Sequence, residues 1–276
     1  MVLETTITPR GPYSLGLSAR FRTDVTRRLR DGVLTVALEA AGRPSLARVS
    51  QGPDGRLRVA IESAEPEEAL ERLRFVLAAD DDHSTFLGRF ADDPLIGRAV
   101  RSLRGLRPLR TATVTHSLLK AVCGQLIQAS AARVLEARLI RRLGTPIGGL
   151  FLPPTRATFG GLAPAQLGRD GLVSRKANAL VRLSREWDVE RLRNVETPAA
   201  AARIERERGL GPWSAGVICL YGLGRYEQGL VGDLGLVRIS AALLGRSAQA
   251  EDTLRLLEPY GEWAGLASVY LLARPT

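Results

Sequence analysis

Residues 209–215 read Gly-Leu-Gly-Pro-Trp-Ser-Ala, and residues 232–236 read Gly-Asp-Leu-Gly-Leu. The first stretch predicts a tight turn between two helices, because glycine adopts positive φ and allows another backbone to approach closely. Pro212 then fits the first position of the second helix, where its missing N–H costs nothing. Asp233 directly precedes an apolar helical pattern, as an N-cap residue does. The chain around these two stretches is therefore predicted to be helical.

The turn also has the chemistry of an anion site. The N–H groups of the first helical turn point outward with the helix dipole behind them, which suits a phosphate oxygen. Such a contact positions DNA without reading its sequence. The residues that we assign to DNA binding are Gly209, Leu210, Gly211 and Ser214. On spacing alone, an ordinary glycine-rich connection and an N-cap worth about 1 kcal/mol remain the simpler explanations of the two stretches.

The composition agrees with a partner of negative charge. The chain has 276 residues and a net charge of +10, which favours a polyanion. Codon bias towards arginine would produce the same excess, since only Lys120 and Lys176 are lysines. The mean hydropathy of −0.01 and the lack of a membrane-length apolar run predict a soluble globular protein. The first residues show no signal-peptide pattern, so we expect a cytoplasmic, nucleoid-associated protein without membrane contact. We also expect a monomer.

The chain has two cysteines, Cys123 and Cys219, and two histidines, His83 and His116. These are too few for a disulfide framework, a cysteine-rich zinc site or a four-cysteine iron–sulfur cluster. Both cysteines lie in apolar helical stretches, where we expect buried thiols. We predict no metal site, and we expect His83 to be an exposed residue at a domain boundary.

The first 82 residues have the pattern of a small antiparallel sheet with one helix. Apolar residues alternate along residues 15–21, 34–38 and 57–61, which predicts strands, and the Gly-Pro-Asp-Gly turn at 52–55 precedes the last of them. A helix is predicted from Pro66, with an apolar face formed by Ala69, Leu70, Leu73, Val76 and Leu77. The aspartates at 80–82 mark a boundary between an α/β domain, residues 1–82, and a second region, residues 83–276.

Beyond the boundary the apolar period stays near 3.6 residues, which predicts an α+β fold with an all-helical second part. Turn residues at 144–146 and 152–155 are expected to be connectors between helices. The expected helices cover residues 94–103, 115–127, 131–143, 175–186, 198–207, 212–222, 234–244 and 262–273.

These motifs carry a resemblance to a known family. The segments 209–215 and 232–236 resemble the helix–hairpin–helix plus Gly/Pro-Asp motif of the DNA glycosylase superfamily. Residues 123–132, Cys-Gly-Gln-Leu-Ile-Gln-Ala-Ser-Ala-Ala, resemble the Gly-Gln segment of the same fold. Together with Thr8–Tyr13 and the N-terminal sheet, the chain is most similar to the 3-methyladenine DNA glycosylase II branch. The resemblance spans nearly the whole chain and implies two helical subdomains that line an active-site cleft.

The resemblance implies roles for individual residues. Asp233 would be the catalytic carboxylate, which stabilises the cationic sugar as the N-glycosidic bond breaks. Bifunctional relatives carry a nucleophilic Lys at the position of Trp213, so the tryptophan implies a water-using enzyme without lyase activity. Trp213 would also stack on a cationic alkylated base, although core packing explains it equally. Leu126 would fill the gap left by a flipped base, with Gln125 assigned to substrate binding beside it, although core packing is the simpler explanation of the leucine.

Tyr270 is assigned to substrate binding, and the matching helices carry fewer aromatic residues than the family's pocket. The expected substrates are alkylated purines of the 3-methyladenine or 7-methylguanine type in double-stranded DNA. No cofactor is required, no iron–sulfur cluster is expected, and a monovalent cation is an optional ligand of the backbone carbonyls between Glu205 and Leu210. The alternatives are deaminated bases such as hypoxanthine or uracil as substrates, or a non-catalytic protein that binds damaged DNA.

Overall fold

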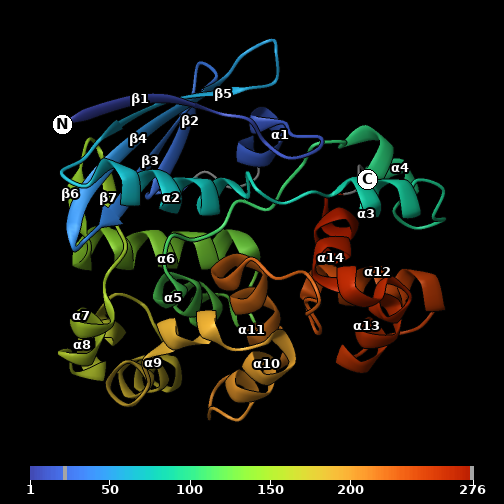
Figure 1. Cartoon of the computed structure of the whole chain (residues 1–276). Coiled ribbons are helices and arrows are strands. Elements are labelled where there is room, and N and C mark those ends of the chain that lie inside the picture. The colour runs from blue at the N-terminus through green and yellow to red at the C-terminus, as the bar shows by residue number, and fades with distance from the viewer. Residues whose placement is uncertain (21–23, 274–276) are drawn as a thin grey trace. The chain divides into compact units, whose positions relative to one another are not determined.

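The computed structural model describes residues 1–20 and 24–273 (Figure 1). Contacts between Cα atoms divide the chain into two compact units that interleave in sequence. The first comprises Met1–Arg89, Leu103–Ala112 and Ala137–Thr155, and the second comprises Phe90–Ser102, Thr113–Glu136 and Arg156–Thr276. The predicted division of the chain into domains 1–82 and 83–276 remains a prediction.

A five-stranded antiparallel sheet forms the centre of the first unit, in the order β1-β5-β4-β3-β2 (Figure 1). The predicted strands at 34–38 and 57–61 and the turn at 52–55 are confirmed, and the helix from Pro66 is α2, Pro66–Leu77. Apolar residues that alternate along the strands face α2 and make one core with it. The strands are β1 (Val2–Ile7), β2 (Arg27–Arg30), β3 (Val33–Ala40), β4 (Arg43–Gln51) and β5 (Leu57–Glu62).

The strand prediction for residues 15–21 is wrong. Residues Leu15–Arg20 form the short helix α1, which buries Leu15, Ser18 and Ala19 at helical spacing. The Ser14 hydroxyl accepts the N–H of Leu17 at 3.3 Å, so a local side chain stabilises the helical turn. The alternating leucines misled the prediction because six residues are too few to separate the two periods. Phe21 lies outside the described residues.

His83 is buried rather than exposed, with 2% of its surface accessible. Burial lowers the pKa of its imidazole to about 3, and the nearby positive charges of Arg107 and Arg110 act in the same direction. Sequence pattern alone could not place His83 inside, because its surroundings come from residues distant in the chain.

The region predicted to be all-helical contains one hairpin, which corrects that prediction. Strands β6 (Thr145–Ile147) and β7 (Leu150–Leu152) pair across Gly148 and Gly149, whose φ values are 55° and 76°. A two-residue turn of this kind needs positive φ, which glycine supplies. Leu150 and Leu152 pack with residues of the first unit's sheet, so burial favours the hairpin over a simple connector.

The eight predicted helices are confirmed within a few residues. They are α4 (Gly97–Ser102), α5 (Val114–Gly124), α6 (Ala129–Leu143), α9 (Ser174–Glu186), α10 (Thr197–Glu205), α11 (Pro212–Val217), α12 (Leu234–Leu244) and α14 (Ala264–Leu272). The others are α3 (Ser84–Arg89), α7 (Arg156–Gly160), α8 (Pro164–Arg169), α13 (Ala250–Leu257), and the 3₁₀ helices η1 (Val189–Asn194) and η3 (Glu258–Trp263). Helix α11 continues into a buried π-helical segment, η2 (Ile218–Leu223), which ends at Gly224 with φ 71°.

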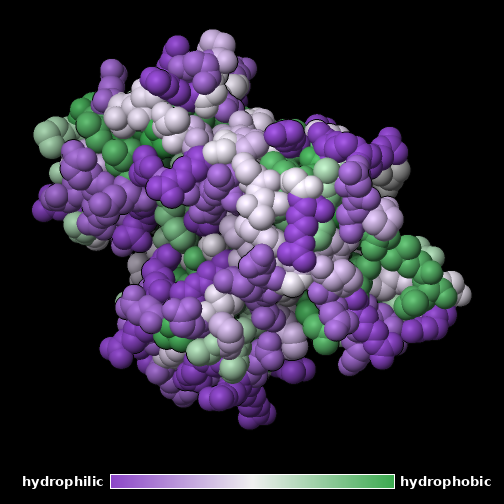
Figure 2. All heavy atoms as spheres, turned by 45° about the vertical axis from the view of Figure 1, so that its right-hand side comes forward, coloured by the Kyte–Doolittle hydropathy of each residue, from purple (hydrophilic) through white to green (hydrophobic). Residues whose placement is uncertain are grey.

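Hydrophilic residues cover most of the face drawn in Figure 2. Across residues 1–20 and 24–273, no helix combines the length and the apolar character needed to cross a membrane.

Candidate functional site

Asp233 and Trp213 meet in the second unit. Asp233 is the N-cap of α12, and its Oδ1 accepts the N–H of Gly235 at 2.8 Å. Its other oxygen, Oδ2, accepts the indole N–H of Trp213 at 3.1 Å. Both side chains are partly exposed. The carboxylate therefore has a donor on each oxygen and a fixed orientation, while part of its surface remains accessible.

The loop before Asp233 is also fixed by side chains. Gly232 has φ 81°, and its N–H donates to the Thr253 hydroxyl at 2.7 Å. The N–H of Leu230 donates to the Ser268 hydroxyl at 3.1 Å. Asp233 consequently stands on a loop whose backbone is bonded to α13 and α14, which is the rigid support that a reacting group needs.

Leu272 is a neighbour of Asp233 that the sequence analysis did not assign. A side chain at Gly235 would collide with Leu272, which places this leucine beside the first turn of α12. Leu272 is 41% exposed. Nothing in the sequence distinguishes it from the other leucines of an apolar helix. Tyr270, two residues earlier, is completely buried, so this conformation offers none of its ring to a bound base.

The hairpin between α10 and α11 follows the predicted geometry at Gly209 and differs at Gly211. Gly209 has φ 96°, where a side chain would be strained and would lie 3.1 Å from the Ala179 Cβ. Gly211 has an extended φ of −148°, and an added Cβ would meet nothing within 4 Å. Gly211, the N-cap of α11, is thus not required by the fold of the turn, and the position that a Cβ would take there is open.

Gln125 connects the Gly-Gln segment to this hairpin. Its side-chain N–H₂ group donates to the Gly209 carbonyl at 2.6 Å and to the Ser214 hydroxyl at 3.1 Å. Ser214 and Leu210 are both buried. The structure thus uses the Gln125 amide and the Ser214 hydroxyl to join two parts of the site.

Leu126 has the most unusual combination of properties in the segment. It is 89% exposed, the highest value among the large hydrophobic residues in the described part of the chain. Its φ of 57° lies in the left-handed region, which costs an L residue about 1–2 kcal/mol. An apolar side chain in a strained backbone and in water is typical of functional sites rather than of packing.

Trp213 packs against the same segment. A Cβ added to Gly124 would lie 2.5 Å from the Trp213 Cη2, so only glycine allows the indole to approach this closely. The indole therefore contacts Asp233 through its N–H and the Gly124 backbone through its six-membered ring.

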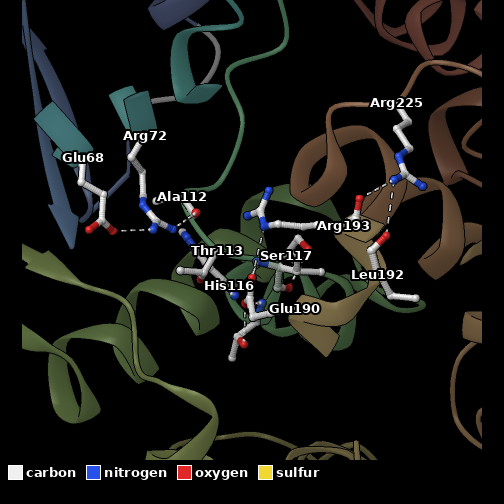
Figure 3. Close-up of polar contacts among 12 residues, drawn as sticks. Glu68, Arg72, Ala112, Thr113, His116, Ser117, Glu190, Leu192, Arg193 and Arg225 are labelled. Atoms are coloured by element: carbon white, nitrogen blue, oxygen red, sulfur yellow. Dashed lines mark hydrogen bonds and ion pairs between the residues drawn. The ribbon is translucent and has the colours of Figure 1, made fainter. Parts of the chain in front are cut away.

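Side chains from distant segments stabilise both ends of α5, the helix that precedes Leu126. At its N-terminus, the Glu190 carboxylate, which is drawn beside Arg193 in Figure 3, accepts the N–H groups of Val114 and Thr115 at 3.1 and 2.8 Å. At its C-terminus, the Lys176 ammonium donates to the Cys123 and Gln125 carbonyls at 3.2 and 2.7 Å. A negative group at the first end and a positive group at the second both complement the helix dipole.

Lys176 was not predicted to contribute to the site. A signal was present, since it is one of two lysines in a strongly basic chain. The contact itself joins residues 51 positions apart and could not be read from the pattern.

Part of the predicted cation segment is already hydrogen-bonded. The carbonyls of Glu207, Arg208 and Gly209 accept donors from Leu210, Arg182 and Gln125. The Arg182 guanidinium is itself positively charged, so the Arg208 carbonyl oxygen that it contacts is not suited to bind a metal cation as well. In residues 1–20 and 24–273, no three His, Cys, Asp or Glu side chains gather in a way that could hold a metal ion. Cys123 and Cys219 are buried, and burial raises the pKa of both thiols.

No protein-family model matches the chain. Among curated proteins, it is 22% identical to the DNA-3-methyladenine glycosylase of Bacillus subtilis over 94% of this chain and 91% of that protein. It is 27% identical to the "Probable bifunctional transcriptional activator/DNA repair enzyme AlkA" of Mycobacterium tuberculosis over 74% of this chain. The match covers 42% of that longer protein.

Solved structures share the fold. The 3-methyladenine DNA glycosylase of Archaeoglobus fulgidus superposes with a TM-score of 0.84, at 22% identity and 97% coverage of both chains. The 8-oxoguanine glycosylase/lyase of Clostridium acetobutylicum, in complex with DNA, superposes with a TM-score of 0.79 at 16% identity, covering 99% of this chain and 96% of that one. The chain is thus similar in sequence to proteins named DNA-3-methyladenine glycosylase and AlkA, and it shares the fold of solved DNA glycosylases, in agreement with the helix–hairpin–helix resemblance.

Proposed function

We propose that the protein is a monofunctional DNA glycosylase that hydrolyses the N-glycosidic bond of alkylated purines flipped out of duplex DNA. The observation that supports this most directly is the contact between Trp213 and Asp233, which puts an aromatic ring and an oriented carboxylate together. The names of the relatives agree with this class of reaction, while the choice of lesion rests on the chemistry of the site.

In the proposed reaction, the bond between C1′ and the base nitrogen breaks with its electron pair leaving on the base. The sugar becomes cationic, and the Asp233 carboxylate stabilises that charge. A water molecule then bonds to C1′ and loses a proton to the solvent, which leaves an abasic sugar and the free base. A purine alkylated at N3 or N7 is already cationic, so it departs as a neutral base without a strong general acid.

The Trp213 ring would select for such bases. A cationic ring stacked on an indole gains about 0.5–2 kcal/mol from cation–π attraction, which a neutral purine does not obtain. The indole has no amine that could form a Schiff base with the sugar, so strand cleavage is not expected. Both properties follow from one side chain, and they distinguish this proposal from a glycosylase/lyase.

Base flipping and DNA positioning complete the proposal. Leu126, exposed and apolar, would enter the stack in place of the extruded base. The open space at Gly211 would let a phosphate oxygen reach the N–H groups at the start of α11. A monovalent cation, if bound by the hairpin, would use carbonyls between Glu205 and Leu210 other than that of Arg208. We further propose that the protein acts as a monomer.

The test is mass spectrometry of the bases released from methylated, deaminated and oxidised duplex DNA. We expect 3-methyladenine and 7-methylguanine from the wild type, and a loss of at least about 100-fold in Asp233→Asn with DNA binding retained. Asp92→Asn, at a side chain that is 99% exposed, is the matched control and should behave as wild type. Release that persists in Asp233→Asn contradicts the catalytic assignment. A covalent adduct trapped by borohydride contradicts the monofunctional mechanism.

A further inference from the structure

The conformation of Leu126 requires an explanation, because the leucine does not stabilise it. The side chain is almost fully exposed, so packing of its own atoms cannot hold φ at 57°. Contacts at neighbouring residues must therefore determine how the segment is presented.

Lys176 provides such a contact from α9. Its Nζ donates to the carbonyls of Cys123 and Gln125, the latter being the C-cap of α5 and the residue before Leu126. Carbonyls at a helix C-terminus lack intrahelical partners, and an ammonium group with three donors satisfies two of them at once. Helix α9 is anchored by the buried Ala177, Leu180 and Val181, so Lys176 projects from a fixed base. Burial lowers the pKa of its amine, which agrees with an ammonium group drawn partly out of water.

The side chain of Gln125 holds the other side of the same residue. It donates to the Gly209 carbonyl and the Ser214 hydroxyl, which belong to the hairpin. Gln125 is thus hydrogen-bonded to α9 through its backbone carbonyl and to the hairpin through its side-chain amide. These two attachments together restrict the residue immediately before Leu126.

We propose that Lys176 is a positioning residue for the insertion of Leu126 into the base stack. It holds the backbone from Cys123 to Gln125, so that Leu126 already has its inserting conformation before DNA binds. This inference rests on the proposed function. Preorganisation removes the cost of ordering the segment when the base leaves the stack. The benefit applies only where a base pair must be opened, because an unpaired lesion needs little help to leave the helix.

The experiment compares Lys176→Met with Arg175→Met, which removes the same charge from an exposed neighbour on α9. Single-turnover excision is measured on one lesion placed either opposite thymine in a duplex or in a single strand. We expect Lys176→Met to lower excision from the paired site about tenfold and to leave the unpaired site unchanged. Arg175→Met should keep the wild-type ratio of the two rates.

Amide hydrogen exchange in the free protein gives a readout that does not depend on activity. Exchange in the peptide spanning residues 124–128 should rise about tenfold in Lys176→Met and stay at the wild-type level in Arg175→Met. If Lys176→Met does not fold, excision and hydrogen exchange are both measured on Lys176→Gln instead.

Equal losses on paired and unpaired sites, or unchanged exchange, overturn the inference. A wild type that releases no base from any substrate overturns the proposed function instead, and the exchange measurement still tests whether Lys176 holds the segment.

Discussion

The indole N–H of Trp213 donates to Asp233 Oδ2 at 3.1 Å, across 20 positions of sequence. Trp213, which would contact the base, and Asp233, which would stabilise the sugar, are therefore joined by a hydrogen bond. A change in the first alters the orientation of the second, so their contributions to catalysis are not independent.

Trp213→Phe separates the two roles of the indole. Phenylalanine keeps an aromatic face but removes the N–H donor, so Asp233 loses a bond that orients Oδ2. We expect single-turnover release of 3-methyladenine to fall about tenfold, corresponding to one hydrogen bond. Trp213→Ala, which also removes the ring, should cost considerably more. If Trp213→Phe has full activity, the hydrogen bond has no role in catalysis.

The two hairpin glycines give a matched pair. Gly209→Ala places a side chain at φ 96°, so we expect thermal stability and DNA affinity to fall together. Gly211→Ala meets no atom within 4 Å and has an extended φ, so stability should stay within about 0.5 kcal/mol of the wild type. Its DNA affinity should nevertheless decrease if the proposed phosphate contact forms, because the methyl group is added at the N-cap of α11, next to the N–H groups that would hold the phosphate. Titration of a fluorescent duplex, together with thermal unfolding, distinguishes these outcomes.

Glu190→Gln tests the support of α5 from its N-terminal end. The carboxylate accepts two backbone N–H groups and the Thr115 hydroxyl, and it pairs with Arg193 (Figure 3). The neutral amide keeps part of the hydrogen bonding but loses the favourable charge at the helix end, for an expected loss of about 1 kcal/mol in urea unfolding. Glu186→Gln, at an exposed (i, i+4) pair with Arg182, is the control and should change stability by less than about 0.5 kcal/mol.

His83 predicts a dependence of stability on pH. Its pKa is about 3 in the folded protein and near 6.5 when unfolded, so acid protonates the unfolded chain first. The free energy of unfolding should therefore decrease as pH falls from about 6.5 towards 3, by at most about 1.4 kcal/mol per pH unit from this group. His83→Gln should flatten that slope between pH 7 and 5. Asp252, whose pKa is lowered to about 2 by its hydrogen bond with Arg246, loses its contribution only below about pH 4 and does not interfere.

The sequence predicted those features that depend on local chemistry. Glycine at 209, proline at 212 and aspartate at 233 each impose a backbone conformation or a cap within a few residues, and their elements were confirmed. The contacts of Gln125 with Gly209 and of Lys176 with Gln125 span 84 and 51 positions, and tertiary packing alone brings these groups together. The two errors have different origins: residues 15–20 were too short a pattern to separate helical from strand spacing, whereas His83 is buried by residues that lie elsewhere in the chain.

The close packing of Gly124 on Trp213 has a consequence for how the site can change. Gly124 is two residues from Leu126, so the ring that would hold the base packs against the same short segment that carries the side chain that would enter DNA. We therefore expect a substitution at Trp213 to affect the position of Leu126, and a change of the Leu126 segment to affect the packing of the Trp213 ring. Attempts to retarget the protein to another lesion would therefore have to vary Trp213 and the Leu126 segment together.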